Sequence, residues 1–367
     1  MSNTKGLIND LPKPPEGKTG WPWTEETSPS IYDAGTTYPK ISIITPSYNQ
    51  GIYIEETIRA VLLQNYPNLE YIVIDGGSTD NTVEIIKKYE PWISYWVSEK
   101  DKGQSNAINK GINKATGKIF NWINSDDYFQ KDALFCVGYE FSKNNLDALS
   151  GHCIFFSSES EKPLKVDNGI ELKSTTEDSI FHHKMNQPAT FFDLDKVKSL
   201  GAVNEALHYT MDFELLKKFL LAFTQAHFKE TTQILSSFRI HESSKTTVSI
   251  DLFEKDKNVV RYSILYSLDA PAYLLQAFRE KNNLPAALHP QKFLVNAAIN
   301  RKKLLSLYFK KSPYFFYENR KYKEARQCIN VATEDNFLKA LFTYPGLLIK
   351  LYLFPSGFIN FLRNLKN

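Results

Sequence analysis

Acidic side chains follow short apolar runs in this sequence. Asp75 directly follows residues 71–74, and Asp126 with Asp127 ends the run that begins at residue 118. Carboxylate oxygens are hard ligands that suit Mg²⁺ or Mn²⁺, and a cation held by them can stabilise the charge that collects on a departing diphosphate. Asp126 and Asp127 are therefore candidate metal ligands.

Other residues have the types that a nucleotide pocket needs. The segment 45–49, Thr-Pro-Ser-Tyr-Asn, can form a turn that presents backbone groups beside a flat aromatic ring. The carboxylate of Asp75 can accept hydrogen bonds from a base or a ribose, and the neighbouring Gly76 and Gly77 allow a close backbone approach. By themselves, such residues also occur in ordinary turns and helix caps.

The elements that must position these side chains are read from the hydrophobic pattern. Apolar runs alternate with helical patterns, which predicts a β-α-β-α-β order and a mainly parallel sheet with helices on both faces. The expected strands are 41–45, 71–75, 93–99 and 118–124, and the expected helices are 52–64, 81–89 and 105–115. Ligands bind at the carboxyl ends of such strands, and the acidic residues fall there.

Long segments of the chain resemble the family-2 glycosyltransferases of the GT-A fold. The resemblance lies in ISIITPSYNQ…IDGGSTDNT and SEKDKGQSNA…NSDDYF, and more loosely in QPATFF, HYTMDFELL and SFRIHESSKT, and it covers roughly residues 40 to 247. It implies an α/β GT-A domain that transfers a sugar from a nucleotide-sugar donor with inversion. UDP-sugars are the usual donors of the family, and GDP- and dTDP-sugars are also used.

The resemblance also assigns roles to individual residues. It implies nucleotide-sugar contacts for the loops that follow the first four strands and for one arginine near residue 240. These residues are Pro46, Ser47, Tyr48, Asp75, Asp101, Gln104, Ser105, Asn124, Ser125 and Arg239.

The metal site and the catalytic base follow from the same resemblance. Asn124 replaces the first Asp of the family's D-x-D-D pattern, so Asp126 becomes the main expected ligand of Mn²⁺ or Mg²⁺, with Asp127 secondary. His241 is expected to complete the metal shell or to contact phosphate. Asp212 is expected to remove the proton of the acceptor hydroxyl, with Glu214 as the alternative base.

The composition and charge of the chain indicate which molecules it can bind and where it is located. A formal net charge of +3 and a sequence pI near 8.4 argue against nucleic acid as a partner. Three well-separated cysteines fit a reducing compartment, and the N-terminus lacks a signal-peptide core, so a cytoplasmic location is expected. The expected acceptor is a glycan or a lipid-linked glycan, in capsule, lipopolysaccharide or another bacterial surface polysaccharide, on analogy alone.

Two other functions compete with this interpretation. A nucleotidyltransferase would want a Gly-rich basic loop after the first strand, and TPSYNQG is not basic. A non-catalytic nucleotide-binding protein at the membrane periphery would keep the pocket but would not need Asp212. The oligomeric state is left open.

Three regions are expected along the chain. A Pro-rich extended arm (1–38) precedes the catalytic domain (39–247), with the fold beginning at Lys40, and a helical region (248–367) follows. Segment 182–188, with His182, His183, Gln187 and Pro188, is expected near the acceptor; spacing argues against zinc there.

The last 28 residues carry apolar side chains interrupted by prolines and cations, which is too broken for a transmembrane helix. They fit an interfacial amphipathic segment on the inner membrane, or a helix packed on the protein or in a dimer interface. The apolar residues in question are Leu347, Leu348, Leu351, Phe358, Phe361, Leu362 and Leu365.

Overall fold

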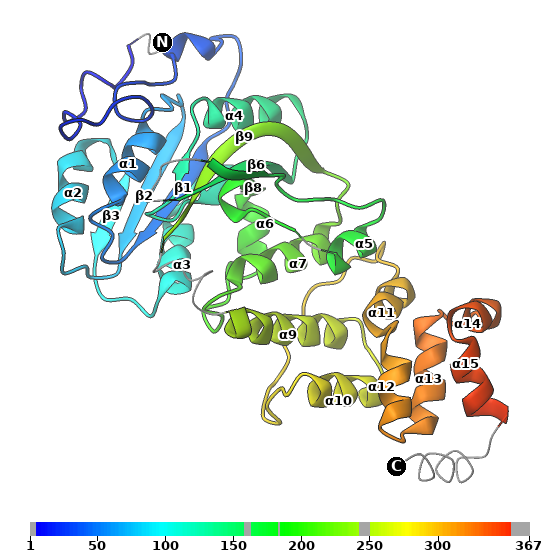
Figure 1. The fold of residues 1–367 in the computed structure, drawn as a ribbon. Coiled ribbons are helices and arrows are strands. Elements are labelled where there is room, and N and C mark those ends of the chain that lie inside the picture. Colours follow the sequence, from blue (N-terminus) through cyan, green and yellow to red (C-terminus); the bar gives the residue numbers. More distant parts are fainter. Residues whose placement is uncertain (1–4, 158–162, 183, 242–249, 354–367) are drawn as a thin grey trace. The chain divides into compact units, whose positions relative to one another are not determined.

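The computed structural model describes residues 5–157, 163–182, 184–241 and 250–353. It divides into two compact units. The sheet unit contains residues 1–171, 184–219 and 225–256, and the helical unit contains residues 172–183, 220–224 and 257–367 (Figure 1).

The first half of the sheet is parallel, as the alternating pattern predicts. Strands β1 (Ile41–Ser47), β2 (Leu69–Asp75), β3 (Tyr95–Ser98) and β4 (Ile119–Trp122) lie in the order β3-β2-β1-β4. In register, Ile41 lies beside Leu69 on one side and Ile119 on the other. Every residue of β1 and β4 is buried, because helices cover both faces of the sheet.

Later strands extend this sheet with mostly antiparallel pairs. Strand β8 (Thr190–Asp193) pairs antiparallel with β4 and with β6 (Ala148–Ser157), whereas the long β9 (Phe228–Ile240) runs parallel to β6. Strand β9 also pairs with β5 (Tyr128–Phe129), and β7 (Pro163–Asp167) pairs with β6. Through these pairings, the end of β9 returns to the segment that follows β4.

The first three helices of the sheet unit match the predicted ones, and further helices follow them. These helices are α1 (Ile54–Leu62), α2 (Thr82–Tyr89), α3 (Gln104–Lys114), α4 (Ala133–Lys143) and α6 (Leu194–Ser199), together with the first turns of α7 (Met211–Phe223) and α9 (Ile250–Ser267). Helix α3 lies directly against β1 at Gly111, where a Cβ atom would stand only 2.5 Å from Ile44. The glycine therefore lets the second half of α3 lie directly on β1.

The N-terminal arm packs on the sheet unit, although its described part, residues 5–38, forms only one short 3-10 helix (Pro29–Ile31). Its main anchor is Arg59 of α1, which is fully buried. The guanidinium donates to the carbonyl oxygens of Pro12, Pro22 and Trp23 at 2.8–3.1 Å. The sequence predicts that the fold begins at Lys40. The arm before Lys40 is nevertheless part of the packed structure, because its carbonyl oxygens accept the hydrogen bonds that a buried guanidinium needs.

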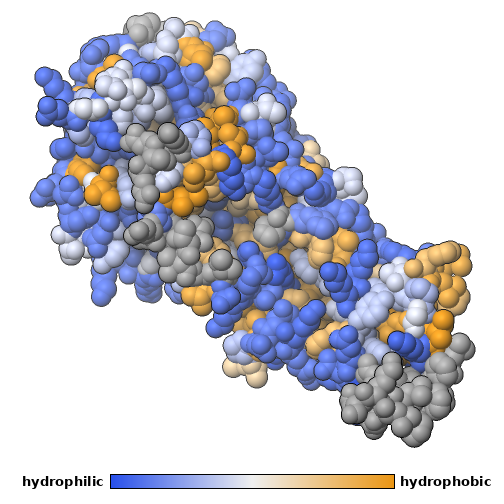
Figure 2. All heavy atoms as spheres, viewed as in Figure 1, coloured by the Kyte–Doolittle hydropathy of each residue, from blue (hydrophilic) through white to orange (hydrophobic). Residues whose placement is uncertain are grey.

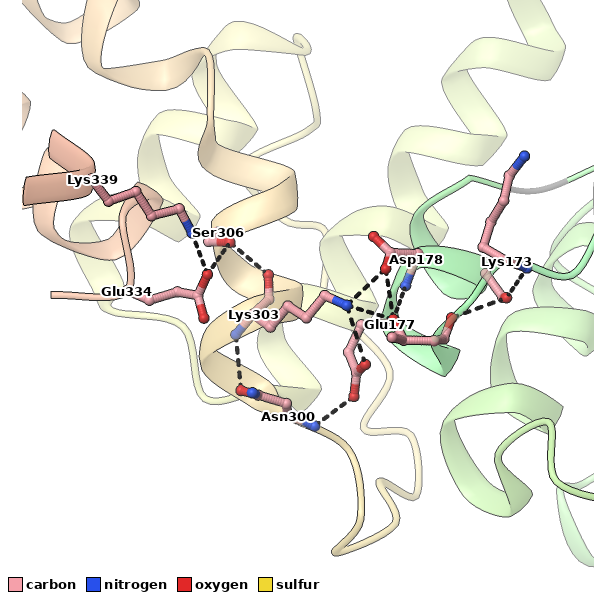
Figure 3. A network of polar contacts seen from close by, with 10 residues as sticks. Lys173, Glu177, Asp178, Asn300, Lys303, Ser306, Glu334 and Lys339 are labelled. Carbon is pink, nitrogen blue, oxygen red and sulfur yellow. Dashed lines mark hydrogen bonds and ion pairs between the residues drawn. The ribbon is translucent and has the colours of Figure 1, made fainter. Parts of the chain in front are cut away.

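The helical unit is built from short helices around its own apolar core. They are α5 (Thr176–Phe181), the rest of α9, α10 (Ala272–Lys281), α11 (Arg301–Phe309), α12 (Ser312–Glu318), α13 (Tyr322–Ala332), α14 (Phe337–Thr343), α15 (Pro345–Leu348) and the π-helix η4 (Ile349–Leu353). A polar network joins α5 to α11 (Figure 3). In it Lys303 donates to Asp178 at 2.7 Å, and the Asn300 N–H donates to Glu177 at 2.7 Å.

The described part of the C-terminal segment packs into this unit. Leu347, Leu348 and Leu351 are buried in the core beside Tyr344, so they are not the lipid-facing side of an amphipathic helix. The other four apolar residues expected on that face, from Phe358 onward, lie outside the described residues. Within the described ranges, no helix is both long and apolar enough to cross a membrane.

Glu70 ties together the amino-terminal edge of the parallel strands. Its carboxylate accepts hydrogen bonds from Lys40 at 2.7 Å, from Ser42 at 2.6 Å and from the backbone and hydroxyl of Thr116 at 2.7 Å. Burial by itself would raise the pKa of Glu70, but these hydrogen bonds outweigh it and lower the pKa from 4.5 to about 2.

We predict that Glu70 makes the fold acid-sensitive. Because its pKa is lower in the folded state, its contribution is complete above pH 4.5 and is lost as the pH falls toward about 2. Glu70→Gln should lower the free energy of unfolding by about 1–3 kcal/mol at neutral pH, with a smaller difference from wild type at low pH. Urea unfolding at several pH values measures both effects. Glu99→Gln, which removes an exposed ion pair to Lys110, is the control and should change little; a constant difference at all pH values for Glu70→Gln would contradict the prediction.

Candidate functional site

A cavity of about 820 Å³ opens in the sheet unit at the carboxyl ends of the parallel strands. Its walls come from the segments that follow β1, β2, β3 and β4, from the residues before β8, from the first residues of α7 and α9, and from the ends of β6 and β9. The expected residues that line it are Pro46, Ser47, Tyr48, Asp101, Gln104, Asn124, Ser125, Asp126, Asp212, His241, Gln187 and Pro188.

The end of β1 places two side chains at the wall of the cavity. The Ser47 hydroxyl is buried and has no hydrogen-bond partner among the described residues. Tyr48, the next residue, leaves 59% of its surface exposed. A buried, unpaired hydroxyl costs free energy unless a ligand bonds it, so this wall is suited to a polar ligand beside an aromatic ring.

Asp101 stands over Gly76 on the neighbouring wall. Its Oδ1 accepts the Gly103 N–H at 2.8 Å, and its Oδ2 would lie 2.7 Å from a Cβ atom at position 76. An aspartate at position 76 would bring two carboxylates into contact here. The glycine therefore leaves Asp101 as the carboxylate of this wall.

Two expected ligand-binding residues lie behind the wall instead. Asp75 is fully buried and accepts hydrogen bonds from the N–H groups of Gly77 and Ser78 at 3.1 and 2.9 Å, and from the Ser98 hydroxyl at 2.6 Å. Ser105 is buried and donates to the Leu207 carbonyl oxygen at 2.9 Å. Neither residue lines the cavity, so both hold loops that do.

The two adjacent aspartates of the loop after β4 point to different surroundings: Asp126 lines the cavity and Asp127 is buried. Asp127 is 1% exposed, and its carboxylate accepts the Arg239 N–H at 2.9 Å and an Asn124 amide N–H at 3.1 Å. Burial and the adjacent Asp126 raise the pKa of Asp127 well above its usual value, against these hydrogen bonds. Asn124 also accepts a hydrogen bond from Gln104 at 2.8 Å. Asp127 does not line the cavity, so the geometry gives it a structural position rather than that of a metal ligand.

Asp126 and His241 form the part of the site best suited to a divalent cation. The Asp126 Oδ2 and the His241 Nε2 lie 3.0 Å apart, and both side chains line the cavity. No cluster of three or more His, Cys, Asp and Glu side chains that could hold a metal occurs among the residues the structure describes. Magnesium-like ions commonly use one or two protein ligands plus waters and substrate phosphates, so a two-residue site fits a cation that arrives with a diphosphate.

Arg239 lies behind this pair rather than in the cavity. It is buried, and its Nη2 forms an ion pair with Glu56 of α1 at 2.6 Å. Its Nε donates to the Asp126 carbonyl oxygen at 2.9 Å, and its guanidinium lies between the rings of Tyr53 and Phe156. In this arrangement Arg239 positions the backbone of Asp126 and does not line the cavity, so its expected contact with phosphate stays a prediction.

The two candidate bases occupy different environments. Asp212, the second residue of α7, lines the cavity, and its Oδ1 accepts the Phe213 N–H at 2.8 Å. Glu214 is buried away from the cavity, where it accepts a hydrogen bond from Asn204 at 3.0 Å and lies 3.6 Å from Lys218. The arrangement therefore favours Asp212 as the group that can reach a ligand.

An aromatic wall, which the sequence did not reveal, closes another side of the cavity. Phe155 and Phe238 have ring centroids 5.1 Å apart, and those of Tyr209 and Phe253 are 5.3 Å apart. Cys153 also lines the cavity, and burial raises its pKa to about 12, which keeps the thiol protonated. The high aromatic content of the chain was a signal. Strand pairing brings Phe155 beside Phe238, whereas Phe253 of α9 meets Tyr209 of the segment before α7, and sequence spacing predicts neither contact.

Of the four residues expected near an acceptor, only Gln187 and Pro188 line the cavity within the described ranges. Gln187 donates to the Trp122 carbonyl oxygen at 2.6 Å. His182 belongs to the helical unit, where it packs against Phe181, and His183 lies outside the described residues.

Sequence comparison connects this site with known proteins. Residues 42–198 match the family described as Glycosyl transferase family 2. An uncharacterized glycosyltransferase of Rickettsia typhi is 29% identical over 60% of this chain and 70% of its own length. A second, from Rickettsia felis, is 30% identical over 63% of this chain but only 39% of its own length.

Structural comparison supports the same fold. The crystal structure of residues 1–349 of S. aureus TarS in complex with UDP-GlcNAc is similar to this chain with a TM-score of 0.54 and 17% sequence identity. The similarity covers 89% of this chain and 87% of that one. At this identity it shows the fold alone, and the GT-A class expected from the sequence is confirmed.

We predict that Arg239 stabilises the folded sheet unit rather than binding a ligand directly. Arg239→Met leaves Glu56 without its buried cationic partner and should lower the free energy of unfolding by about 3–5 kcal/mol. Lys110→Met, which removes an exposed partner of Glu99, is the control and should cost less than about 1 kcal/mol. Urea unfolding without ligand measures both. An Arg239→Met protein of normal stability that has lost only nucleotide affinity would restore the phosphate role.

Proposed function

Because the chain belongs to glycosyltransferase family 2, we propose that it transfers a sugar from a nucleotide-sugar donor to an acceptor hydroxyl with inversion at the anomeric carbon. One observation carries the proposal. A single cavity brings together the unpaired Ser47 hydroxyl, the Asp126–His241 pair and the Asp212 carboxylate. These are the groups needed to hold a nucleotide, to stabilise a diphosphate and to accept a proton.

The donor side is assigned to the loops at the ends of the parallel strands. Ser47 would bond the nucleotide, Tyr48 would lie against it, and Asp101 and Gln104 would accept and donate further hydrogen bonds. We propose a UDP-sugar as the donor, because UDP-sugars are the usual donors of the family. TarS, which has a similar fold, has been crystallised with UDP-GlcNAc.

The diphosphate is assigned to Asp126 and His241, which would hold Mn²⁺ or Mg²⁺ between them and the phosphate oxygens. Such a cation stabilises negative charge on the leaving diphosphate. Arg239 holds the Asp126 backbone in place from behind, and Asp127 and Asn124 stiffen the same loop. In this proposal Arg239, Asp127, Asp75 and Ser105 support the site without touching the donor.

The proton is assigned to Asp212. Inversion by single displacement requires the acceptor hydroxyl to attack the anomeric carbon from the side opposite the diphosphate, and a carboxylate there must take its proton. Asp212 comes from α7, whereas the diphosphate groups come from the loop after β4 and the end of β9. The two functions therefore come from separate walls of one cavity.

The acceptor is assigned to the aromatic wall. Half-buried rings offer flat apolar surfaces that suit the apolar faces of sugar rings, so Phe155, Tyr209, Phe238 and Phe253 favour a glycan or a lipid-linked glycan. A putative teichuronic acid biosynthesis glycosyltransferase of Bacillus subtilis is 40% identical over 26% of this chain and 39% of its own length. We propose, with that relative as analogy, a role in the synthesis of a bacterial surface polysaccharide.

The metal assignment predicts cation-dependent donor binding. Calorimetry with UDP in the presence of Mn²⁺ should give an affinity that falls at least about tenfold in EDTA and equally in Asp126→Ala, because both remove the cation from the diphosphate. Asp195→Ala, which removes an exposed carboxylate of α6, is the control and should bind UDP as wild type does. The metal role would be excluded by equal UDP affinity with Mn²⁺, with EDTA and in Asp126→Ala.

The base assignment predicts that binding and chemistry separate. Asp212→Asn keeps the size of the side chain and an oxygen for the Phe213 N–H but cannot accept a proton, so turnover should fall roughly 100- to 10,000-fold while UDP affinity is retained. Glu214→Gln should lower stability, because it disturbs buried bonds, yet leave turnover per folded molecule nearly unchanged. Transfer from a nucleotide-sugar panel measures turnover, and thermal unfolding corrects for the folded fraction. Normal turnover in Asp212→Asn would leave that residue as a structural part of α7 only.

A further inference from the structure

Large apolar side chains are exposed on consecutive helices at the end of the described chain. We call this group the α14–η4 patch; its exposed fractions run from 41% for Leu341 to 87% for Phe342. Figure 2 shows hydrophobic side chains gathered on this part of the helical unit. The patch consists of Phe337, Leu338, Leu341, Phe342, Ile349 and Tyr352.

These residues are not an incompletely packed part of the core. The same helices bury Tyr344, Leu347 and Leu351 against α12 and α13, so their inward face is already satisfied. Phe337, Leu341, Ile349 and Tyr352 instead border an open groove of about 470 Å³. Six large exposed apolar residues within 16 positions are far more than scattered surface residues would give, which points to an interaction surface.

The charged residues of the patch helices are positive. Residues 338–353, the described part of this segment, contain Lys339 and Lys350 and no acidic residue. Two acidic residues come just before this segment. Glu334 is paired with Lys339, as Figure 3 shows. Asp335 is paired with Lys302.

Arg326 adds a further cation from α13. Its guanidinium lies 5.2 Å from the ring centre of Tyr352, at the edge of the patch. Aromatic and aliphatic side chains bordered by cations are the combination that an anionic lipid surface binds, since the apolar groups enter the acyl boundary and the cations meet the headgroups.

We propose that the α14–η4 patch binds the surface of an anionic lipid bilayer. The surface is formed by side chains on the outside of folded helices, and not by the leucines that the apolar spacing of the sequence selected. The absence of acidic residues from residue 338 onward favours a lipid surface over a second copy of this chain, because two such segments would repel each other. This inference does not depend on the proposed transfer reaction.

Co-sedimentation of the full chain with vesicles tests the inference. Wild type should bind vesicles of phosphatidylcholine mixed with phosphatidylglycerol and should bind much less to phosphatidylcholine alone or in high salt. Phe337→Ser with Phe342→Ser should weaken binding to the anionic vesicles roughly 10- to 100-fold, because two exposed apolar groups are lost from the contact. Since both side chains are already exposed, circular dichroism and the thermal midpoint should remain unchanged.

Leu164→Ser with Val166→Ser is the matched control, because these two exposed apolar residues lie on β7 of the sheet unit. It should bind vesicles as wild type does. No binding by wild type, or equal loss of binding in both double variants, would overturn the inference. Sedimentation velocity tests the remaining alternative, which is self-association. If wild type is a dimer and the Phe337→Ser, Phe342→Ser variant is a monomer, the patch is a self-association surface and the inference is overturned.

Discussion

The buried guanidinium of Arg239 is the contact on which the geometry of the site depends. It bonds Glu56 of α1 on one side and the Asp126 carbonyl oxygen on the other, while its own N–H bonds Asp127. A buried cation must be paired, so the end of β9 cannot leave α1 without leaving a charge uncompensated, and moving the loop after β4 would break two further hydrogen bonds. The end of β9 is thereby held against the loop after β4, and His241, two residues further on, comes within 3.0 Å of Asp126.

The contacts of Arg239 also give the adjacent residues Asp126 and Asp127 different positions. Asp126 faces the cavity with its carboxylate beside His241, whereas Asp127 turns into the protein and binds the Arg239 and Asn124 N–H groups. Asp75 at the end of β2 is likewise committed to N–H and hydroxyl groups of its surroundings. Carboxylates at strand ends can thus either meet the ligand or build the loop that meets it, and the available donors decide which.

The second half of the sheet and the N-terminal arm complete this arrangement in different ways. Strands β6 and β9 run parallel and deliver Phe155 and Phe238 to the cavity, so this part of the aromatic wall is made by strands that come after the parallel half of the sheet. The arm supplies carbonyl oxygens to Arg59, which lets a cation lie within the apolar core at α1. Helix α1 also carries Glu56, so the arm supports the element that anchors Arg239.

By itself, the sequence determined the local features: the apolar runs that became β1, β2 and β4, the loops at their ends, the helical C-terminal region, and the family match over residues 42–198, which includes Asp126. These depend on short-range periodicity and on residues near one another in the chain. Tertiary structure decided which of the marked residues reach the cavity, because the direction of a side chain depends on distant donors: Arg239 and Glu56 are 183 positions apart. It also buried Glu214 and the leucines of α15, assembled the aromatic wall, and turned Phe337 and Phe342 outward, since burial is set by the elements that pack together and not by spacing along one segment.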